Sequence, residues 1–202
     1  DLKMVMIPDS VENIGIGTFS NCTQLANISW SKNLEKIGEN AFYNCDNLQI
    51  VEIPKSLKDV YATYDSIDIP NGVFNGCSNL KTVNFEEGST IIADALFRGC
   101  DGLEEVTIPD TITEIYGYVF ADCKNLKNIN ISDSVTVIGQ SVFEGDTSIK
   151  EINLPDSITK LGARVFSGCN SLESIVIPDS VINIGIGAFS ECKNLKSVTL
   201  SR

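Results

Sequence analysis

The sequence contains no histidine and is poor in positive charge. Histidine is the commonest general base of enzymes and the commonest zinc ligand of proteins. Its absence removes the usual central residue of acid–base catalytic sites and of zinc sites. Lysine and arginine number 15 against 27 aspartates and glutamates, which gives a net charge of −12. Because an acidic chain repels phosphate backbones, we expect no nucleic-acid partner.

Long apolar runs and catalytic motifs are also missing. No segment reaches the roughly 18 consecutive apolar residues of a membrane span, so we expect no transmembrane segment in this sequence. The seven cysteines lack the close Cys-x-x-Cys pairs of structural zinc sites. No nucleophile–base pair and no phosphate-binding glycine loop is present. The sequence therefore predicts no catalytic residue, no metal site and no cofactor, and we expect a protein that is not an enzyme.

What the sequence has instead is a regular period in phenylalanine. Eight phenylalanines follow one another at 23-residue intervals, apart from one 32-residue step: Phe19, Phe42, Phe74, Phe97, Phe120, Phe143, Phe166 and Phe189. A fixed period between about 20 and 50 residues is typical of repeat proteins, whose units bury their apolar faces only by stacking on their neighbours. The period therefore predicts a solenoid.

Other positions keep the same register. A cysteine stands three residues after nearly every one of these phenylalanines, and the pattern Leu-x-x-Ile-x-Ile begins three residues later. The stretch from Leu103 to Ile108 shows the alternation of apolar and polar residues that is typical of a half-buried strand. Because equivalent strands lie a whole turn apart and run the same way, the pattern predicts one parallel sheet along one face.

The rest of each unit predicts two further segments. Proline often follows the strand and ends the pairing, and a short apolar pair such as Val135 and Ile138 then predicts a short strand on the opposite wall. Glycine frequently closes this strand, as Gly139 does, and permits a tight turn. The segment from the glycine to the cysteine is too short for a long helix, so we expect a single helical or 3-10 turn that places the phenylalanine in the core.

The unit Cys-x-x-Leu-x-x-Ile-x-Ile-Pro-x-Ser-Val-x-x-Ile-Gly-x-x-Ala-Phe resembles the BspA-type, or Treponema pallidum-type, leucine-rich repeat of bacteria, and Ser167 to Ser190 is a clean copy. The resemblance implies a β-rich leucine-rich-repeat solenoid of about eight 23-residue repeats, with the parallel sheet on the concave face. We expect residues 1–202 to form a single array, and to be a piece of a longer protein because the chain begins within a repeat. The resemblance also implies an extracellular protein, secreted or at the cell surface, that binds other molecules.

The cysteines should form a buried column, in which they act as small apolar filler; a redox or disulfide role is the alternative. In the sixth unit Asp146 stands where the other units have cysteine. An uncompensated carboxylate is costly to bury. We therefore expect Asp146 either to turn outward or to accept backbone hydrogen bonds.

The 32-residue step adds nine residues, which alignment of the units places near 58–66. Insertions in solenoids form loops on one face, often the binding face. Tyr61, Tyr64 and Asp65 are candidate binding residues here, because tyrosine is favoured at interface hot spots. Simple tolerance of a longer loop is the alternative interpretation.

The outward positions of the long strands supply the second candidate site. They form a face rich in Asn, Ser, Thr and Glu, and its candidate binding residues are Glu52, Asn84, Glu105, Asn128, Asn130, Glu151 and Asn153. A solvated face without a ligand is the alternative. We expect a recognition or adhesion module whose partner is a protein, such as a host matrix protein or receptor, or a glycan. A structural spacer in a larger surface protein is the competing hypothesis, and an enzyme is a remote one.

Overall fold

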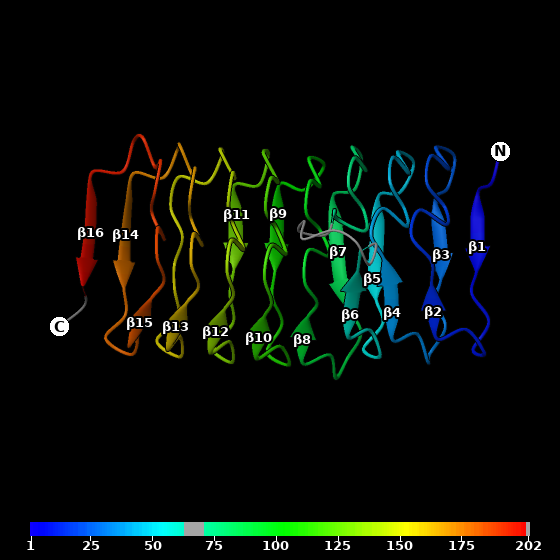
Figure 1. The fold of residues 1–202 in the computed structure, drawn as a ribbon, viewed down its shortest axis with the longest axis horizontal. Helices are drawn as coiled ribbons and strands as arrows, with labels where there is room; N and C mark the ends of the chain where they lie inside the picture. The colour runs from blue at the N-terminus through cyan, green and yellow to red at the C-terminus, as the bar shows by residue number, and fades with distance from the viewer. Residues whose placement is uncertain (63–70, 201–202) are drawn as a thin grey trace.

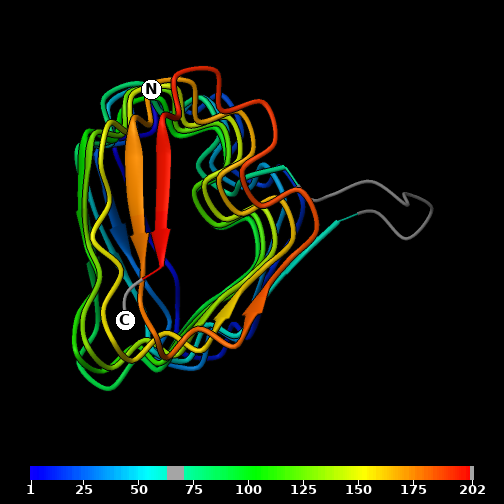
Figure 2. The same cartoon turned by 90° about the vertical axis from the view of Figure 1, so that its left-hand side faces the viewer.

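The computed structural model describes residues 1–62 and 71–200, which form turns that follow one another along the long axis of the molecule (Figure 1). The view along that axis shows the turns superposed, with the long strands β14 and β16 on one side and the short strand β15 on another (Figure 2). The secondary structure of these residues consists of strands and turns. The expected leucine-rich-repeat solenoid is therefore confirmed.

One wall, called here the long-strand face, carries one strand in each turn except the turn of residues 150–154, which forms none. Its strands are three or four residues long: β1 (Met4–Met6), β3 (Asn27–Ser29), β5 (Ile50–Ile53), β7 (Thr82–Phe85), β9 (Glu105–Thr107), β11 (Asn128–Asn130), β14 (Ser174–Ile177) and β16 (Ser197–Leu200). All of the pairing between these strands is parallel, as the repeat predicts. In β5, for example, Val51 and Ile53 are buried whereas Ile50 and Glu52 are exposed.

The long-strand face differs from the expected single sheet because its strands pair two by two. The pairs are β1 with β3, β5 with β7, β9 with β11, and β14 with β16. Within the described ranges, no backbone hydrogen bond joins β3 to β5 or β7 to β9, nor does any join β11 to the next turn at residues 150–154. We call these three interruptions the seams of the face.

Each seam coincides with an irregular side chain. Trp30 and Phe85 occupy a position that is aliphatic in the other turns, and their rings contact phenylalanine rings that follow them in the chain. Trp30 lies edge-on to Phe42 at 5.4 Å and to Phe74 at 6.5 Å, and Phe85 lies edge-on to Phe97 at 6.3 Å. A bulky ring at an aliphatic position changes the packing at these two places, because cores are closely packed. The third seam follows Asp146.

The opposite wall, called the short-strand wall, carries strands of two or three residues. They are β2 (Asn13–Ile14), β4 (Lys36–Gly38), β6 (Asp59–Tyr61), β8 (Ile91–Ile92), β10 (Glu114–Ile115), β12 (Val137–Ile138), β13 (Lys160–Leu161) and β15 (Asn183–Ile184). They pair in parallel as one three-stranded and one five-stranded sheet, and the division falls between β6 and β8. The predicted short strands are confirmed.

The register of β6 relocates the additional residues. β6 pairs with β4 at an offset of 23 residues, with Tyr61 opposite Gly38, so residues 59–61 belong to the regular turn. Phe74 stacks on Phe42, 32 residues earlier. The nine extra residues therefore fall between Tyr61 and Phe74, so residues 58–61 at the start of the expected range 58–66 are not among them. The sequence alignment misplaced them because Asp59-Val60-Tyr61 does not look like Lys36-Ile37-Gly38, although both segments form the same strand.

The third wall, which contains the phenylalanines, is a stack of turns rather than the expected helical or 3-10 segment. Residues two before and two after the phenylalanine take left-handed backbone angles in most turns, as Tyr118 (φ 58°) and Asp122 (φ 62°) do around Phe120. Alternate amides then donate to the next turn, for example Phe120 to Val142 at 3.0 Å. A helix would satisfy these amides within its own segment, whereas here half of them join neighbouring turns.

The core lies between these walls and is built around the phenylalanine column. The eight rings stack from turn to turn, with centroids 5.1 Å to 5.9 Å apart and planes within 20° of parallel. The six inner rings are completely buried, whereas Phe19 and Phe189 in the end turns are partly exposed. Each turn therefore completes its core only with its neighbours, as the period predicts.

Candidate binding surfaces

The predicted residues of the long-strand face lie together on one exposed wall. Glu52, Asn84, Glu105, Asn128, Asn130, Glu151 and Asn153 are all exposed. Glu52 lies directly opposite Asn84 across the β5–β7 pair, and Asn128 lies opposite Glu105 across the β9–β11 pair. Glu151 and Asn153 keep the exposed positions of a strand although residues 150–154 are not paired as one.

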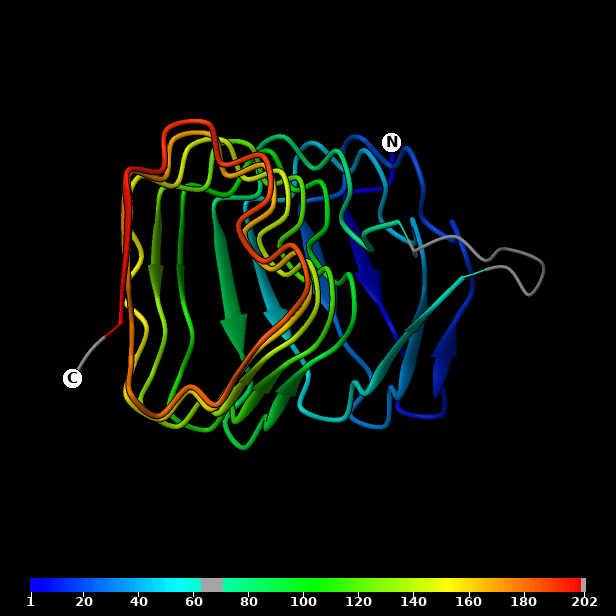
Figure 3. The same cartoon turned by 60° about the vertical axis from the view of Figure 1, so that its left-hand side comes forward.

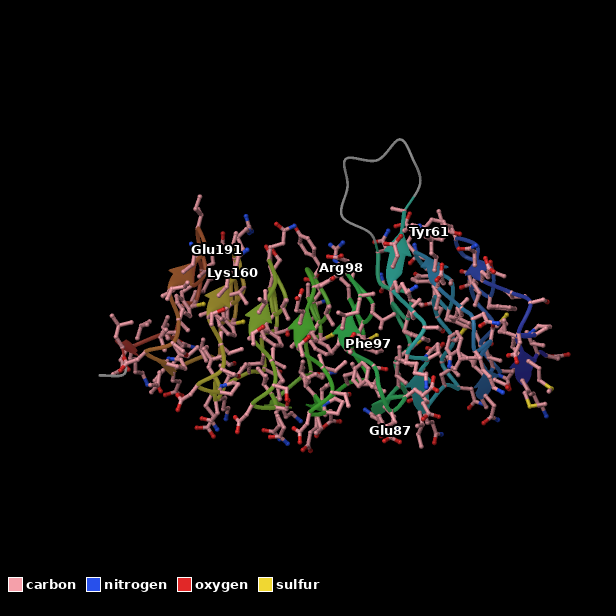
Figure 4. The ribbon with its side chains drawn as sticks, turned by 90° about the horizontal axis from the view of Figure 1, so that it is seen from below. Tyr61, Glu87, Phe97, Arg98, Lys160 and Glu191 are labelled. Atoms are coloured by element: carbon pink, nitrogen blue, oxygen red, sulfur yellow. The ribbon has the colours of Figure 1, made fainter. Side chains whose placement is uncertain are left out.

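Tyr61 lies elsewhere, on the short-strand wall. Figure 4 shows Tyr61 at one edge of the array together with Arg98, Lys160 and Glu191, whereas Glu87 lies at the opposite edge. The Tyr61 side chain is half-buried, and its hydroxyl donates a hydrogen bond of 3.0 Å to the carbonyl of Ile14, two turns back. The structure therefore gives Tyr61 a bracing role across β4. Tyr64 and Asp65 lie outside the described residues.

Three shallow grooves open on the long-strand face next to its seams. One of about 510 Å³ includes Trp30 of the β3 turn together with Glu52 of β5. The other two lie on either side of residues 150–154: one of about 200 Å³ includes Asn153 and Val176, and one of about 400 Å³ includes Lys127 and Lys150. Sequence reasoning missed Trp30, Lys127 and Lys150. For the two lysines the available signal is their common position, seven residues after the phenylalanine, in consecutive units.

The charges on this wall form ion pairs between turns. The Glu104 carboxylate forms ion pairs with the ammonium groups of Lys127, at an N–O distance of 3.0 Å, and Lys81, at 3.3 Å. The Lys196 ammonium group lies 2.7 Å from the Glu173 carboxylate. Hydrogen bonds from Lys127 and Lys81 lower the pKa of the Glu104 carboxyl, and Lys196 lowers the pKa of Glu173 in the same way. All of these side chains are about half exposed or more, so each pair adds little stability.

The cysteine column is an internal structure and not a reactive site. From Cys45 onward each thiol donates a hydrogen bond to the carbonyl of a phenylalanine one turn back, as Cys123 does to Phe97 at 3.2 Å. Burial raises the pKa of the Cys45 thiol to about 12 and that of Cys123 well above its usual range. All seven cysteines are free. The predicted buried column is confirmed, with a donor role added to packing.

Asp146 is completely buried in this column, so it does not turn outward. One carboxyl oxygen accepts a 2.8 Å hydrogen bond from the amide of Cys123, as the second expected arrangement requires. The other oxygen has no partner among the described residues. Burial raises the pKa of this carboxyl well above its usual range, and the charges of Asp122 and Asp101 raise it further.

In residues 1–62 and 71–200, no group of three or more His, Cys, Asp or Glu side chains is placed to hold a metal ion. The same residues include no helix of the length and apolarity needed to cross a membrane.

The walls, the stacked core and the parallel pairing define a parallel β-solenoid built from repeats (Figure 3). The family model of the BspA-type leucine-rich repeat region matches residues 1–64, 56–173 and 159–202, with six copies. The chain therefore belongs to the BspA-type leucine-rich repeat family.

Solved bacterial structures share this fold. A leucine-rich repeat protein of Bacteroides ovatus is 31% identical with a TM-score of 0.69, and the match covers 98% of this chain and 55% of that one. A leucine-rich cell surface protein of Faecalibacterium prausnitzii is 27% identical with a TM-score of 0.58, over 100% of this chain and 60% of that one. The T. pallidum leucine-rich repeat protein is 26% identical with a TM-score of 0.50, covering 84% and 64%.

This chain thus spans little more than half the length of the first two proteins. The search of curated proteins returns no significant match to this chain.

Proposed function

We propose that this chain is a non-enzymatic recognition module of a secreted or cell-surface protein and binds a partner through the long-strand face. The observation that carries the proposal is the exposure of all seven predicted face residues on one regular wall. Neighbouring strands about 4.8 Å apart make a wall roughly 35 Å long, which suits a protein domain or an extended chain. The likeness to a cell surface protein of F. prausnitzii supports the location.

The partner class is a protein, such as a host matrix protein or receptor, or a glycan. The outward side chains of the face are mainly Asn, Ser, Thr and Glu, with few apolar exceptions such as Ile50 and Val176. A polar wall with few aromatic anchors, such as Trp30 in one groove, gives modest affinity at each site. Repetition of the same wall along a longer array would raise the avidity without new contacts.

A binding screen with wall-specific variants tests the proposal. The chain is screened against immobilised matrix proteins, receptor ectodomains and glycans, and each hit is measured again with the double variant Glu105→Arg and Asn130→Arg. Both residues are exposed on the long-strand face, so the fold should be kept. The matched control is Glu114→Arg with Asn183→Arg, which makes the same changes on the short-strand wall. We expect loss of binding with the first variant only.

Two outcomes would contradict the proposal. Equal loss of binding in both double variants would show a nonspecific charge effect. Unchanged binding in both, or no hit with the unmodified chain, would favour the structural spacer, in which other parts of a larger protein carry the binding.

A further inference from the structure

The residues seven positions after each phenylalanine form a charged ridge beside the long-strand face. From the third turn on, the ridge consists of Lys81, Glu104, Lys127, Lys150, Glu173 and Lys196. Opposite charges on neighbouring turns pair along it, as Lys81 and Lys127 do with Glu104 and as Lys196 does with Glu173. On either side of the middle of the ridge, lysines are therefore paired with glutamates of a neighbouring turn.

The middle of the ridge breaks this rule, because Lys127 and Lys150 are neighbours of like charge. Within the described residues, no carboxylate lies within ion-pair distance of the Lys150 ammonium group. The same step is the third seam, where β11 makes no backbone hydrogen bond to residues 150–154. Two neighbouring ammonium groups therefore lie at an opening in the wall of a chain whose net charge is −12; Lys127 is paired with Glu104, and the charge of Lys150 acts on the Glu173 carboxyl of the next turn.

A groove of about 400 Å³ occupies this opening, and its lining offers both donors and acceptors. Besides the two ammonium groups, the Asn128 amide and the Ser171 hydroxyl can donate. The Ser148 hydroxyl already donates to the carbonyl of Lys124 at 2.6 Å, so it faces a ligand as an acceptor, and Glu151 is a second acceptor. A volume of this size lies in the range of small-ligand sites.

We infer that this groove binds an acidic sugar residue of a glycan, with its carboxylate or sulfate between Lys127 and Lys150 and its hydroxyls donating to Glu151 and Ser148. An acidic side chain of a protein would bring negative charge to the same lysines, but an acidic sugar carries several hydroxyl donors on the same ring as its anionic group, so one residue can meet the lysines and the acceptors together. The mixed lining therefore favours the sugar. This inference rests on the proposed function, since it names the partner class and one site on the same face.

The test uses isothermal titration calorimetry of the chain with a tetrasaccharide of alternating glucuronic acid and N-acetylglucosamine. The comparison ligands are its carboxyl-reduced, neutral form and an acidic peptide. The variants are Lys150→Gln, Lys127→Gln and Lys81→Gln. Lys81→Gln is the matched control, because Lys81 has the same ridge position and also pairs with Glu104 but does not line the groove. Each variant changes the net charge by the same amount, and thermal unfolding checks its fold.

We expect Lys150→Gln and Lys127→Gln each to weaken binding of the acidic tetrasaccharide about tenfold, as the loss of one hydrogen bond to a charged group predicts. The control Lys81→Gln and the conservative Lys150→Arg should bind as the unmodified chain does, and the neutral tetrasaccharide should not bind. Equal loss in Lys81→Gln, equal binding of the neutral form, or no binding of the acidic form would overturn the inference.

Acidic-peptide binding that depends on Lys150 would assign the groove to a protein partner and would also overturn the inference. The proposed function fails separately. If Glu105→Arg with Asn130→Arg abolishes partner binding while Lys150→Gln leaves it unchanged, recognition by the face stands and only the sugar site is lost.

Discussion

At residue 146 a carboxyl group occupies a column in which the other turns place thiols. A thiol is a small group that donates one weak hydrogen bond, which is what the carbonyl of the preceding turn needs. Asp146 is as deeply buried as those thiols. One of its oxygens accepts a hydrogen bond from the amide of Cys123, and the other has no partner in the described ranges. Only the neutral carboxylic acid can also act as a donor, so burial favours the protonated form.

The protonation of Asp146 predicts an unusual pH dependence of stability. Its folded-state pKa is raised above the unfolded value near 3.9, so its contribution is complete below about pH 4 and is lost as pH rises through the folded-state pKa. Relative to Asp146→Asn, the unfolding free energy of the unmodified chain should fall by about 1.4 kcal/mol per pH unit across that window. Urea unfolding of both proteins from pH 4 to pH 7 measures this difference.

The pH dependence of stability must be compared between the unmodified chain and Asp146→Asn. Exposed carboxylates such as Glu104, whose pKa is lowered, make the unfolding free energy rise with pH, and this effect is the same in both proteins. Parallel stability curves for the unmodified chain and Asp146→Asn would show that Asp146 does not titrate as its burial implies. Asp146→Cys restores the thiol column, and we expect it to be more stable than the unmodified chain at pH 7.

The remaining thiols predict a pattern of reactivity. Cys22 and Cys192, in the end turns, are partly exposed, whereas the other five are buried and hydrogen-bonded. Because the thiolate is the reactive form and burial disfavours it, maleimide should label Cys22 first and the five buried cysteines only after unfolding. Mass spectrometry of native and urea-treated samples gives the count. Rapid native labelling of Cys100 or Cys123 would contradict the packing described above.

At the scale of the elements, the long-strand face is a row of strand pairs divided by seams. Trp30, directly after β3, and Phe85, at the end of β7, stand at two of the seams, and the third seam follows Asp146. Amides that face a seam have no partner strand, so solvent can reach them without opening of the turn. The seams therefore make backbone pairing differ from place to place along an array whose sequence repeat is regular.

Hydrogen exchange should distinguish paired strands from the third seam. We expect the amides of residues 150–154 to exchange faster than those of β11, since β11 is hydrogen-bonded to β9 and residues 150–154 donate to neither neighbour. Peptide-resolved mass spectrometry compares the two segments within one sample. Equal protection would mean that the sheet is continuous in solution.

The sequence predicts these elements well where each residue acts alone and poorly where two turns interact. The alternation in Leu103 to Ile108 predicts β9 because burial depends on the side of the strand. The turn around Phe120 was expected to be helical, since its own residues do not reveal that the amide of Phe120 bonds to Val142 of the next turn. The candidate site shows the same difference between single residues and contacts between turns. The exposure of Asn130 was predictable from its own strand, whereas the Lys127–Lys150 groove depends on a seam between two turns.

At the scale of the whole molecule, residues 1–62 and 71–200 taken as an isolated chain leave their first and last turns with a stacked neighbour on one side only. In the last described turn Ile182 is 86%, Ile184 is 44% and Ile186 is 90% exposed, and the inner-turn equivalents of Ile184, Ile138 and Leu161, are buried. An apolar patch of this kind promotes association at high concentration, against the repulsion of a net charge of −12.

The double variant Ile182→Lys and Ile186→Lys tests this consequence. Because both side chains are already in water, the unfolding free energy should change by no more than about 0.5 kcal/mol. Association of the isolated chain should fall, which sedimentation velocity over a range of concentrations would detect. A large loss of stability would show that these isoleucines are packed in solution, and unchanged association would place the self-contact elsewhere.

The sequence by itself determined the period, the family, the parallel stacking and the outward polar face, because each follows from residues that recur at a fixed spacing in every turn. Only the tertiary structure decided how the array departs from uniformity. The structure shows that the nine additional residues follow Tyr61 and that the Tyr61 hydroxyl bonds to the carbonyl of Ile14. It also shows that the long-strand face has three seams and that Lys127 and Lys150 line one groove. These features depend on contacts between turns, and the spacing of residues within one turn carries no information about them.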